Sequence, residues 1–349
     1  MQRRIMSAPK HNTQALLAST QAKPESSAPF VSVLIPARNE EKFIGRCIAS
    51  VWATGWPADQ LEILVIDHQS TDNTAAVARE AGARVISADR EKKIGAVRNV
   101  GLIAAKGNFV AFVDADCTVP RTWLGSAINI LASDPSVGAV GGGPALAPVD
   151  GTWVERCLAP TRRTSTLCAI ACTLTTCSIV SRRELLCDLG YFNENVISGE
   201  DDDISNRIRE RGLILIAAAD CRVVHHGFAR TLPQIVRKEI WHGSNHLEVR
   251  SGLDVTLGLT LLFLASSCVV LVCLSAVILR PRPLFLDALV GSLVLQLAPP
   301  GLFALKKLQR SGWPWLLSAP MIIVGYAYFL GHAIGVLGNV RRRLFTSSS

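Results

Sequence analysis

The first part of the chain alternates short apolar runs with segments in which apolar residues recur at helical spacing. Continuous apolar runs of this length predict buried strands, and they occupy residues 31–35, 61–66, 83–87 and 109–113. Helical spacing predicts helices over residues 40–51, 74–81 and 96–105. Strands that alternate with helices in this way are typical of βαβ units with a parallel sheet. The predicted fold class is therefore α/β.

The pattern changes after residue 250, where long apolar runs replace the alternation. The run 253–279 is long enough to cross a hydrocarbon core of about 30 Å as a helix, and 316–340 is a second candidate span. The run 284–305 is weaker, because it contains Asp287, Gln296 and two adjacent prolines. We expect a disordered polar tail (1–29), a globular domain (30–250), a transmembrane region (251–340) and a basic polar tail (341–349).

Charge supports a membrane partner and argues against nucleic acid. The formal net charge is +8, and basic residues cluster beside the apolar runs at 237–238, 306–307 and 341–343. Attraction to anionic lipid explains this placement, whereas a nucleic-acid module would gather them with aromatic side chains on one face. If all three runs span the membrane, residues 306–310 and 341–343 lie on opposite sides of it. If the middle run is re-entrant, the two basic clusters exchange sides and remain opposite. The sequence leaves this topology open.

The ten cysteines do not form a disulfide framework in this interpretation. Cys168, Cys172 and Cys177 lie close together, but their spacing is not that of a CxxC pair. A chain of 349 residues does not need disulfides to stabilise its fold. We expect reduced cysteines that pack as small apolar side chains.

Polar groups follow the predicted strands, at the sheet edge where parallel α/β sheets bind ligands. They occupy residues 36–40, 67–74 and 114–116. Asp114 and Asp116 are two residues apart on an extended chain, so their carboxylates face the same way. Two like charges held together favour a cation between them, and Mg²⁺ or Mn²⁺ binds such carboxylates. The alternative is a solvated turn.

A fourth acidic group, Glu200 to Asp203, opens a predicted helix. Ser198 and Asp201 fit the spacing of a capping box, and acidic residues favour a helix N-terminus. Capping does not account for four consecutive acids, which repel one another. We therefore expect a functional role for Glu200 and Asp201.

Taken together, the motifs resemble those of the family 2 glycosyltransferases. The blocks occur in the family's order over residues 30–250: VSVLIPARNE, then VID with STD, then G-x-x-RN-x-G, then DAD, then GED-x-D. The resemblance implies a GT-A nucleotide-diphospho-sugar transferase fold, a mostly parallel sheet flanked by helices, with C-terminal transmembrane helices in addition. It also implies a nucleotide-sugar donor and a divalent metal, Mg²⁺ or Mn²⁺.

The resemblance also implies roles for individual residues. The donor's nucleobase and ribose would be held by Pro36, Ala37, Arg38, Glu40 and Asp67. Arg98 would lie near the donor diphosphate, Asp114 would contact nucleotide and metal, and Asp116 would bind the metal.

Asp201, with Glu200 beside it, would be the catalytic base of an inverting displacement. His225 or His226 would be a third metal ligand, and the alternative is a histidine pair that ends a strand.

Two departures from the family pattern bear on the function. His68 stands where the family often has a second Asp. Gln234, Arg237 and Trp241 form Q-x-x-R-x-x-x-W, whereas similar processive synthases have Q-x-x-R-W. The surrounding segment 232–247 is amphipathic, which is typical either of a helix on the membrane surface or of one packed in the globular core. The displaced tryptophan favours transfer of a single sugar over synthesis of a polymer.

We expect a multi-pass enzyme of the cell membrane whose catalytic domain faces the cytosol. It would transfer one sugar to a lipid-linked, membrane-proximal or polysaccharide acceptor. Two alternatives remain: a processive polysaccharide synthase, and a non-catalytic membrane scaffold that binds nucleotide without transfer.

Overall fold

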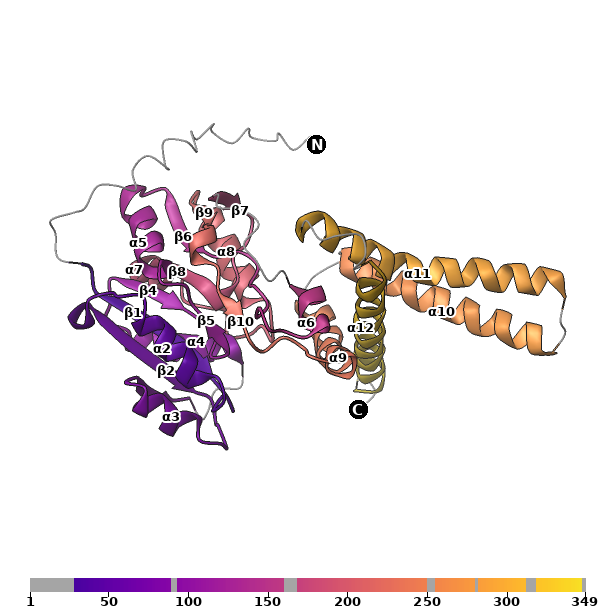
Figure 1. Ribbon diagram of the computed structural model, residues 1–349, viewed down its shortest axis with the longest axis horizontal. Coiled ribbons are helices and arrows are strands. Elements are labelled where there is room, and N and C mark those ends of the chain that lie inside the picture. The colour runs from indigo at the N-terminus through magenta and orange to yellow at the C-terminus, as the bar shows by residue number, and fades with distance from the viewer. Residues whose placement is uncertain are drawn as a thin grey trace.

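The computed structural model describes residues 28–88, 93–159, 168–249, 255–279, 282–311 and 318–346. Most of the predicted N-terminal tail, Trp313, Trp315 and the last three residues lie outside this part. The described chain forms an α/β unit, from which a pair of long helices extends to one side (Figure 1).

An eight-stranded sheet organises the α/β unit, in the order β3-β2-β1-β4-β8-β6-β9-β7. Its first half is parallel and consists of β1 (Val31–Ala37), β2 (Leu61–Asp67), β3 (Arg84–Ser87) and β4 (Phe109–Phe112). Its second half is mixed and consists of β6 (Val137–Gly141), β7 (Ala169–Ala171), β8 (Ile179–Arg182) and β9 (Ile214–Ala217). The predicted α/β class is confirmed.

β1 is fully buried and lies between β2 and β4, which explains its continuous apolar sequence. The predicted end of this strand at residue 35, before Pro36, was wrong, because β1 continues to Ala37 and Pro36 pairs with Ile66 of β2. Pairing with β4 stops at Leu34, so the missing N–H of Pro36 interrupts no ladder on that side.

Helices cover both faces of the sheet. One face packs against α2 (Ile44–Trp52), α3 (Thr74–Glu80) and α5 (Trp123–Ser133), with Trp123 fully buried. The other packs against α4 (Ile94–Ala104), α7 (Arg183–Asp188) and α8 (Glu200–Glu210), where Phe112 meets Phe192 edge to face. These two apolar layers fix the carboxyl ends of β1, β2 and β4, from which the candidate site is built.

Four helices follow the sheet. Their bounds are α9 (Leu232–Val249), α10 (Val255–Leu279), α11 (Pro283–Ser311) and α12 (Ser318–Thr346). Among the described residues, α10, α11 and α12 are long and apolar enough to cross a membrane, over Val255–Leu279, Pro283–Lys306 and Ala319–Arg341. The weaker predicted run forms a continuous helix in spite of Pro299 and Pro300. All ten cysteines lie in the described part of the chain, and no disulfide joins any of them, as expected.

Candidate active site

Two loops after β1 and β2 are tied together by hydrogen bonds. Thr71 N donates to Asn39 Oδ1 at 2.8 Å, and Glu40 N donates to Thr74 Oγ1 at 2.7 Å. Asn39 and Gln69 have φ of 58° and 57°, a left-handed conformation in which non-glycine residues are uncommon. The sequence places small polar side chains at these strand ends, and their bonds to backbone N–H groups hold both loops in one shape.

The predicted nucleotide-binding residues meet at this edge. Pro36 and Ala37 are buried in β1, whereas Arg38 is exposed. Burial raises the pKa of Glu40 to about 7, and repulsion by Asp116 adds to the shift. Asp67 Oδ1 at the end of β2 is buried and has no hydrogen-bond partner in the described chain. Because a buried unpaired acceptor is costly, Asp67 is suited to a ligand that donates hydrogen bonds.

Four potential metal ligands converge beyond β4. One ligand atom from each of Asp114, Asp116, Cys117 and His225 lies within 4.8 Å of the others. His225 Nε2 is 3.6 Å from Asp116 Oδ2. β5 (Cys117–Thr118) pairs with β10 (Val224–His225), and this pairing brings segments about a hundred residues apart together. Sequence reasoning missed Cys117, because it assigned all the cysteines to apolar packing.

The structure separates the two adjacent histidines. His226 Nε2 lies 3.1 Å from Thr118 Oγ1, and its Nδ1 lies 3.4 Å from Arg46. Phe43 also stacks on its ring. These contacts hold His226 apart from the acidic pair, so His225 is the candidate ligand of the two.

The cluster fits a hard divalent cation. Burial raises the pKa of Asp116, which means that its charge lacks full compensation there. A Cβ at Gly227 would lie 1.9 Å from Asp116 Oδ2, so the absence of a side chain keeps the space beside this carboxylate open. Carboxylate oxygens and an imidazole are suitable ligands for Mn²⁺, and carboxylates suit Mg²⁺. Gly227 N donates to His225 Nδ1 at 3.1 Å, so this bond must change if Nε2 is to bind a metal.

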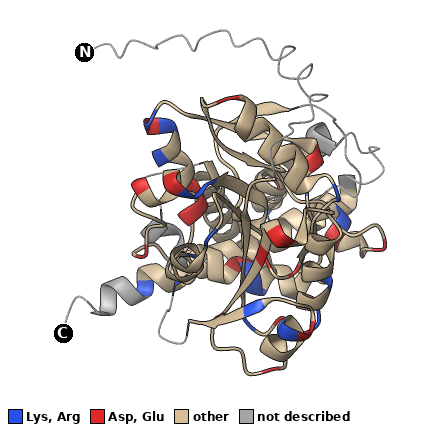
Figure 2. Ribbon diagram, turned by 90° about the vertical axis from the view of Figure 1, so that its left-hand side faces the viewer, with Lys and Arg blue, Asp and Glu red and all other residues tan. Residues whose placement is uncertain are grey.

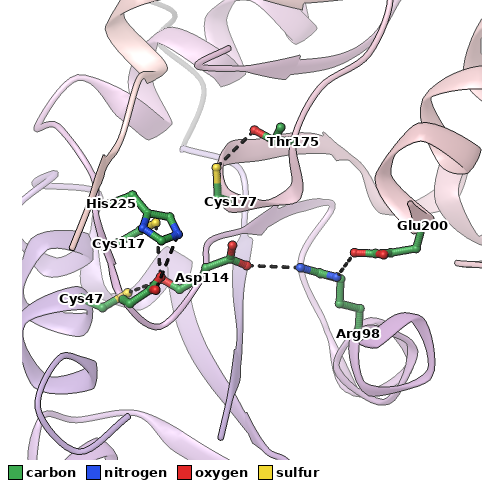
Figure 3. Close-up of polar contacts among 9 residues, drawn as sticks. Cys47, Arg98, Asp114, Cys117, Thr175, Cys177, Glu200 and His225 are labelled. Atoms are coloured by element: carbon green, nitrogen blue, oxygen red, sulfur yellow. Dashed lines mark hydrogen bonds and ion pairs between the residues drawn. The ribbon is translucent and has the colours of Figure 1, made fainter. Parts of the chain in front are cut away.

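Arg98 links the metal candidates to α8. It is only 4% exposed, and its guanidinium lies 3.2 Å from Asp114 Oδ1 and 2.5 Å from Glu200 Oε1 (Figure 3). A buried charge of this kind is held by pairing with opposite charges. Arg98 therefore lies at the predicted site, but its bonds in this structure go to the protein's own carboxylates.

Asp201 lies in the first turn of α8. The predicted capping box at Ser198 was wrong: the N-cap is Gly199, in a left-handed conformation with φ of 82°, and no side chain caps the helix. Asp202 N donates to Asp201 Oδ1 at 3.0 Å. Burial, followed by repulsion from Glu200, raises the pKa of Asp201 to about 6. A carboxylate tuned in this way is a candidate general base.

Asp114, Glu200 and Asp201 line a cavity of about 500 Å³. The other side of this cavity is formed by helices outside the sheet, through Glu239, Trp241 and His242 of α9, Thr256 of α10, and Tyr328 and His332 of α12. His332 Nδ1 lies 3.6 Å from Glu239 Oε2, and both side chains are buried. Sequence reasoning did not find Glu239 or His332, because the fold alone brings α12 to the active-site side of α9.

Known glycosyltransferases resemble this chain in sequence. Residues 32–185 match the family model described as Glycosyl transferase family 2. Glycosyltransferase AglE of Haloferax volcanii is 29% identical over 231 residues, 64% of this chain and 75% of that protein. Pre-mycofactocin glycosyltransferase of Mycobacterium tuberculosis is 29% identical over 248 residues, 66% of this chain and 50% of that protein.

A solved structure has the same fold. It is that of mannosyltransferase PcManGT from Pyrobaculum calidifontis in complex with GDP-Man and Mn²⁺, and it aligns with a TM-score of 0.53 at 22% identity. The alignment covers 93% of this chain and 94% of the other, so it includes the helices after the sheet.

Proposed function

From the match of residues 32–185 to the model of Glycosyl transferase family 2, together with the GT-A fold, we propose that the chain is a glycosyltransferase of this family with a specific reaction. The protein is an inverting, metal-dependent transferase of the cell membrane. It moves a single sugar from a nucleotide-sugar donor to a lipid-linked acceptor, with its catalytic domain facing the cytosol, where such donors are made.

One observation carries the proposal: a single cavity joins the catalytic carboxylates to the apolar helices. Asp114 and Asp201 line it on the side of the sheet, and Trp241 and Tyr328 line it on the side of α9 and α12. An acceptor attached to a lipid would therefore reach Asp201 from the helices, without leaving the membrane surface. The loops after β1 and β2, where a nucleotide would bind, lie at the same carboxyl edge of the sheet as Asp114.

The side chains on the donor side of the site suit the nucleobase, ribose and diphosphate of a nucleotide sugar. Glu40 and Asp67 supply acceptors for the hydrogen-bond donors of a nucleobase and ribose. Asp114, Asp116 and His225 would hold the metal, which when bound neutralises charge on the donor diphosphate. Opposite unit charges at about 4 Å attract by about 4 kcal/mol at an effective dielectric constant near 20. Several kcal/mol of transition-state stabilisation is therefore available on this side.

Asp201 acts on the acceptor side. The acceptor hydroxyl oxygen forms a bond to the anomeric carbon of the sugar, and the bond from that carbon to the diphosphate oxygen breaks. The hydroxyl proton passes to Asp201 Oδ, and the leaving diphosphate keeps the bonding electron pair. One displacement from the face opposite the leaving group inverts the anomeric carbon, and Arg98 holds Glu200 and Asp114 in place during it.

The proposed reaction is tested by following a labelled sugar from the donor to the lipid product. Detergent-solubilised enzyme is incubated with a nucleotide sugar labelled in its sugar, Mn²⁺ and lipid extract from the source membrane. We expect label in the organic phase, one sugar per lipid, with the anomeric configuration opposite to that of the donor. A ladder of products would favour a processive synthase instead, and retained configuration would contradict the single displacement.

A further inference from the structure

α12 is apolar enough to span a membrane, yet it is placed differently from α10 and α11. α10 and α11 run side by side away from the α/β unit, whereas α12 lies across their base beside α9 (Figure 1). In the view turned by 90°, the chain reaches the C-terminus through a helix that projects toward the lower left (Figure 2). More than half of its most apolar window is buried, 56% against 11% for α10. α12 therefore packs mainly on α9 rather than on α10 and α11.

Glycines make the contact between α9 and α12 very close. A Cβ at Gly243 of α9 would lie 2.2 Å from His332 O, and a Cβ at Gly331 of α12 would lie 2.5 Å from Val236 O. Asn339 Nδ2 also donates to Ser244 O at 2.5 Å. α9 follows directly from the catalytic domain, so this packing fixes the direction of α12 relative to that domain.

The exposed apolar side chains of α12 form one stripe. They recur every three or four residues, which places them on one face of a helix, and they are Ile323, Tyr326, Leu330, Ile334, Leu337 and Val340. The opposite flank carries Tyr328 and His332 and borders the catalytic cavity. The rest of that flank packs against protein through buried apolar residues such as Val324 and Ala333. A helix that lies in a membrane surface would bury its exposed apolar stripe in the lipid.

An apolar groove of about 830 Å³ opens between α9 and α12 on the side of this stripe. It is lined by apolar side chains such as Val236, Ile240 and Leu330, and Leu297 of α11 closes one part of it. Arg237 is the cation among its lining residues. Hydrocarbon matches the groove, and a lipid phosphate matches the guanidinium.

The basic clusters give independent support. Lys306, Lys307 and Arg310 lie at the end of α11, and Arg341 to Arg343 lie near the end of α12. If all three helices cross the bilayer, these clusters lie on opposite sides. If only α10 and α11 cross, both clusters lie beside Arg237 and Lys238, and only Arg280 and Arg282 lie on the far side. The second arrangement satisfies the positive-inside rule.

We propose that α10 and α11 alone cross the bilayer, and that α9 and α12 lie together in the surface of the leaflet next to the catalytic domain. The groove between them holds a hydrocarbon chain of an anionic bilayer lipid. This topology is independent of the reaction that the enzyme performs, and it places the catalytic cavity directly above the headgroups.

Epitope tags test the topology in the full-length protein. One tag is placed at each terminus and one between α10 and α11, at residues 280–282, and sealed membrane vesicles are treated with protease. We expect the N- and C-terminal tags to be cleaved from the same face, while the tag between α10 and α11 is protected on that face. Cleavage of the C-terminal tag from the same face as the tag between α10 and α11 would overturn the proposal.

Photoactivatable phospholipids give a second measurement. One lipid carries a diazirine near the headgroup and another near the end of the acyl chain. We expect the first to label the exposed stripe of α12 from Ile323 to Leu337 along its whole length. If α12 crosses the bilayer, the headgroup probe labels only its ends and the chain-end probe labels its middle, which would contradict an in-plane helix.

Discussion

At the scale of single residues, Asp201 combines burial with proximity to other acids. Its pKa is raised to about 6, mainly by burial and then by Glu200. A base with this pKa is ionised at neutral pH and still accepts a proton readily. The sequence indicated Asp201 through its position in the acidic run, but its environment depends on α8, α9 and Arg98 coming together.

The rate should follow the ionisation of Asp201. Turnover is constant above about pH 7 and falls as the pH drops through about 6, because the protonated carboxyl accepts no proton. Asp201→Asn lowers kcat by about 10²–10⁴-fold at neutral pH and leaves donor binding unchanged. A pH series of kcat in both proteins, with donor affinity measured by calorimetry, checks this.

The same substitution should stabilise the fold. A carboxyl whose folded pKa is raised favours folding below its unfolded pKa, and this contribution is lost as the pH rises through the folded value. At pH 7 the ionised Asp201 is therefore unfavourable, and Asp201→Asn raises the melting temperature. If the variant melts at a lower temperature, Asp201 has a structural role and the activity loss is not diagnostic.

His225 and His226 offer a matched pair for the metal site. His225→Ala removes a candidate ligand beside Asp116 and should weaken Mn²⁺ binding by at least about tenfold, as disturbed metal sites commonly do. His226→Ala removes a ring held by Thr118 and Arg46 and should leave the affinity unchanged. Electron paramagnetic resonance of free Mn²⁺ measures both. Equal affinities in the two variants would exclude His225 as a ligand.

At the scale of elements, sequence patterns predicted the first four strands well. β1 and β2 are buried on both faces, so their apolar runs are continuous and their ends coincide with polar groups. The helix predicted from residue 40 begins instead at Ile44, because residues 40–43 form a turn tied to the β2 loop. The second half of the sheet was not predicted, since β8 pairs antiparallel with β4 and β6, partners distant in sequence.

The amphipathic segment 232–247 was recognised from its sequence, but its packing partner was not. It forms α9, whose apolar face packs on α12 and whose other flank lines the catalytic cavity. Gln234 Oε1 accepts from Arg230 N at 2.7 Å, so this glutamine holds the start of α9. The pattern predicted a helix with two faces, but the identity of its partner depends on the fold of the last hundred residues.

Close packing of α9 on α12 gives a matched pair of variants within one helix. Gly331→Ala places a Cβ 2.5 Å from Val236 O, and such overpacking typically costs about 1–3 kcal/mol. Gly338→Ala meets nothing within 4 Å and gains up to about 1 kcal/mol of helix propensity. Thermal unfolding in detergent should show opposite shifts. A melting temperature unchanged by Gly331→Ala would contradict the close contact.

At the scale of the whole molecule, the α/β unit and the helices that follow it line one cavity from opposite sides. The α/β unit supplies the carboxylates, α9, α10 and α12 supply the opposite wall of the cavity, and α10 to α12 are long and apolar enough to cross a membrane. The order of the motifs indicated the fold class of the first region, but not the strand pairing in the second half of its sheet. The meeting of Asp201 with α9 and α12 is a property of the folded chain alone.

Release of nucleoside diphosphate measures whether the cavity between the α/β unit and the C-terminal helices is a sugar-transfer site. Purified enzyme in detergent with membrane lipid is given each common nucleotide sugar in turn, with Mn²⁺, with Mg²⁺ and with EDTA. We predict metal-dependent release of nucleoside diphosphate from one donor, abolished by EDTA and by Asp116→Ala, and reduced at least about 10²-fold by Asp201→Asn. Release that persists in EDTA, or an Asp201→Asn variant as fast as the unaltered enzyme, would contradict the account.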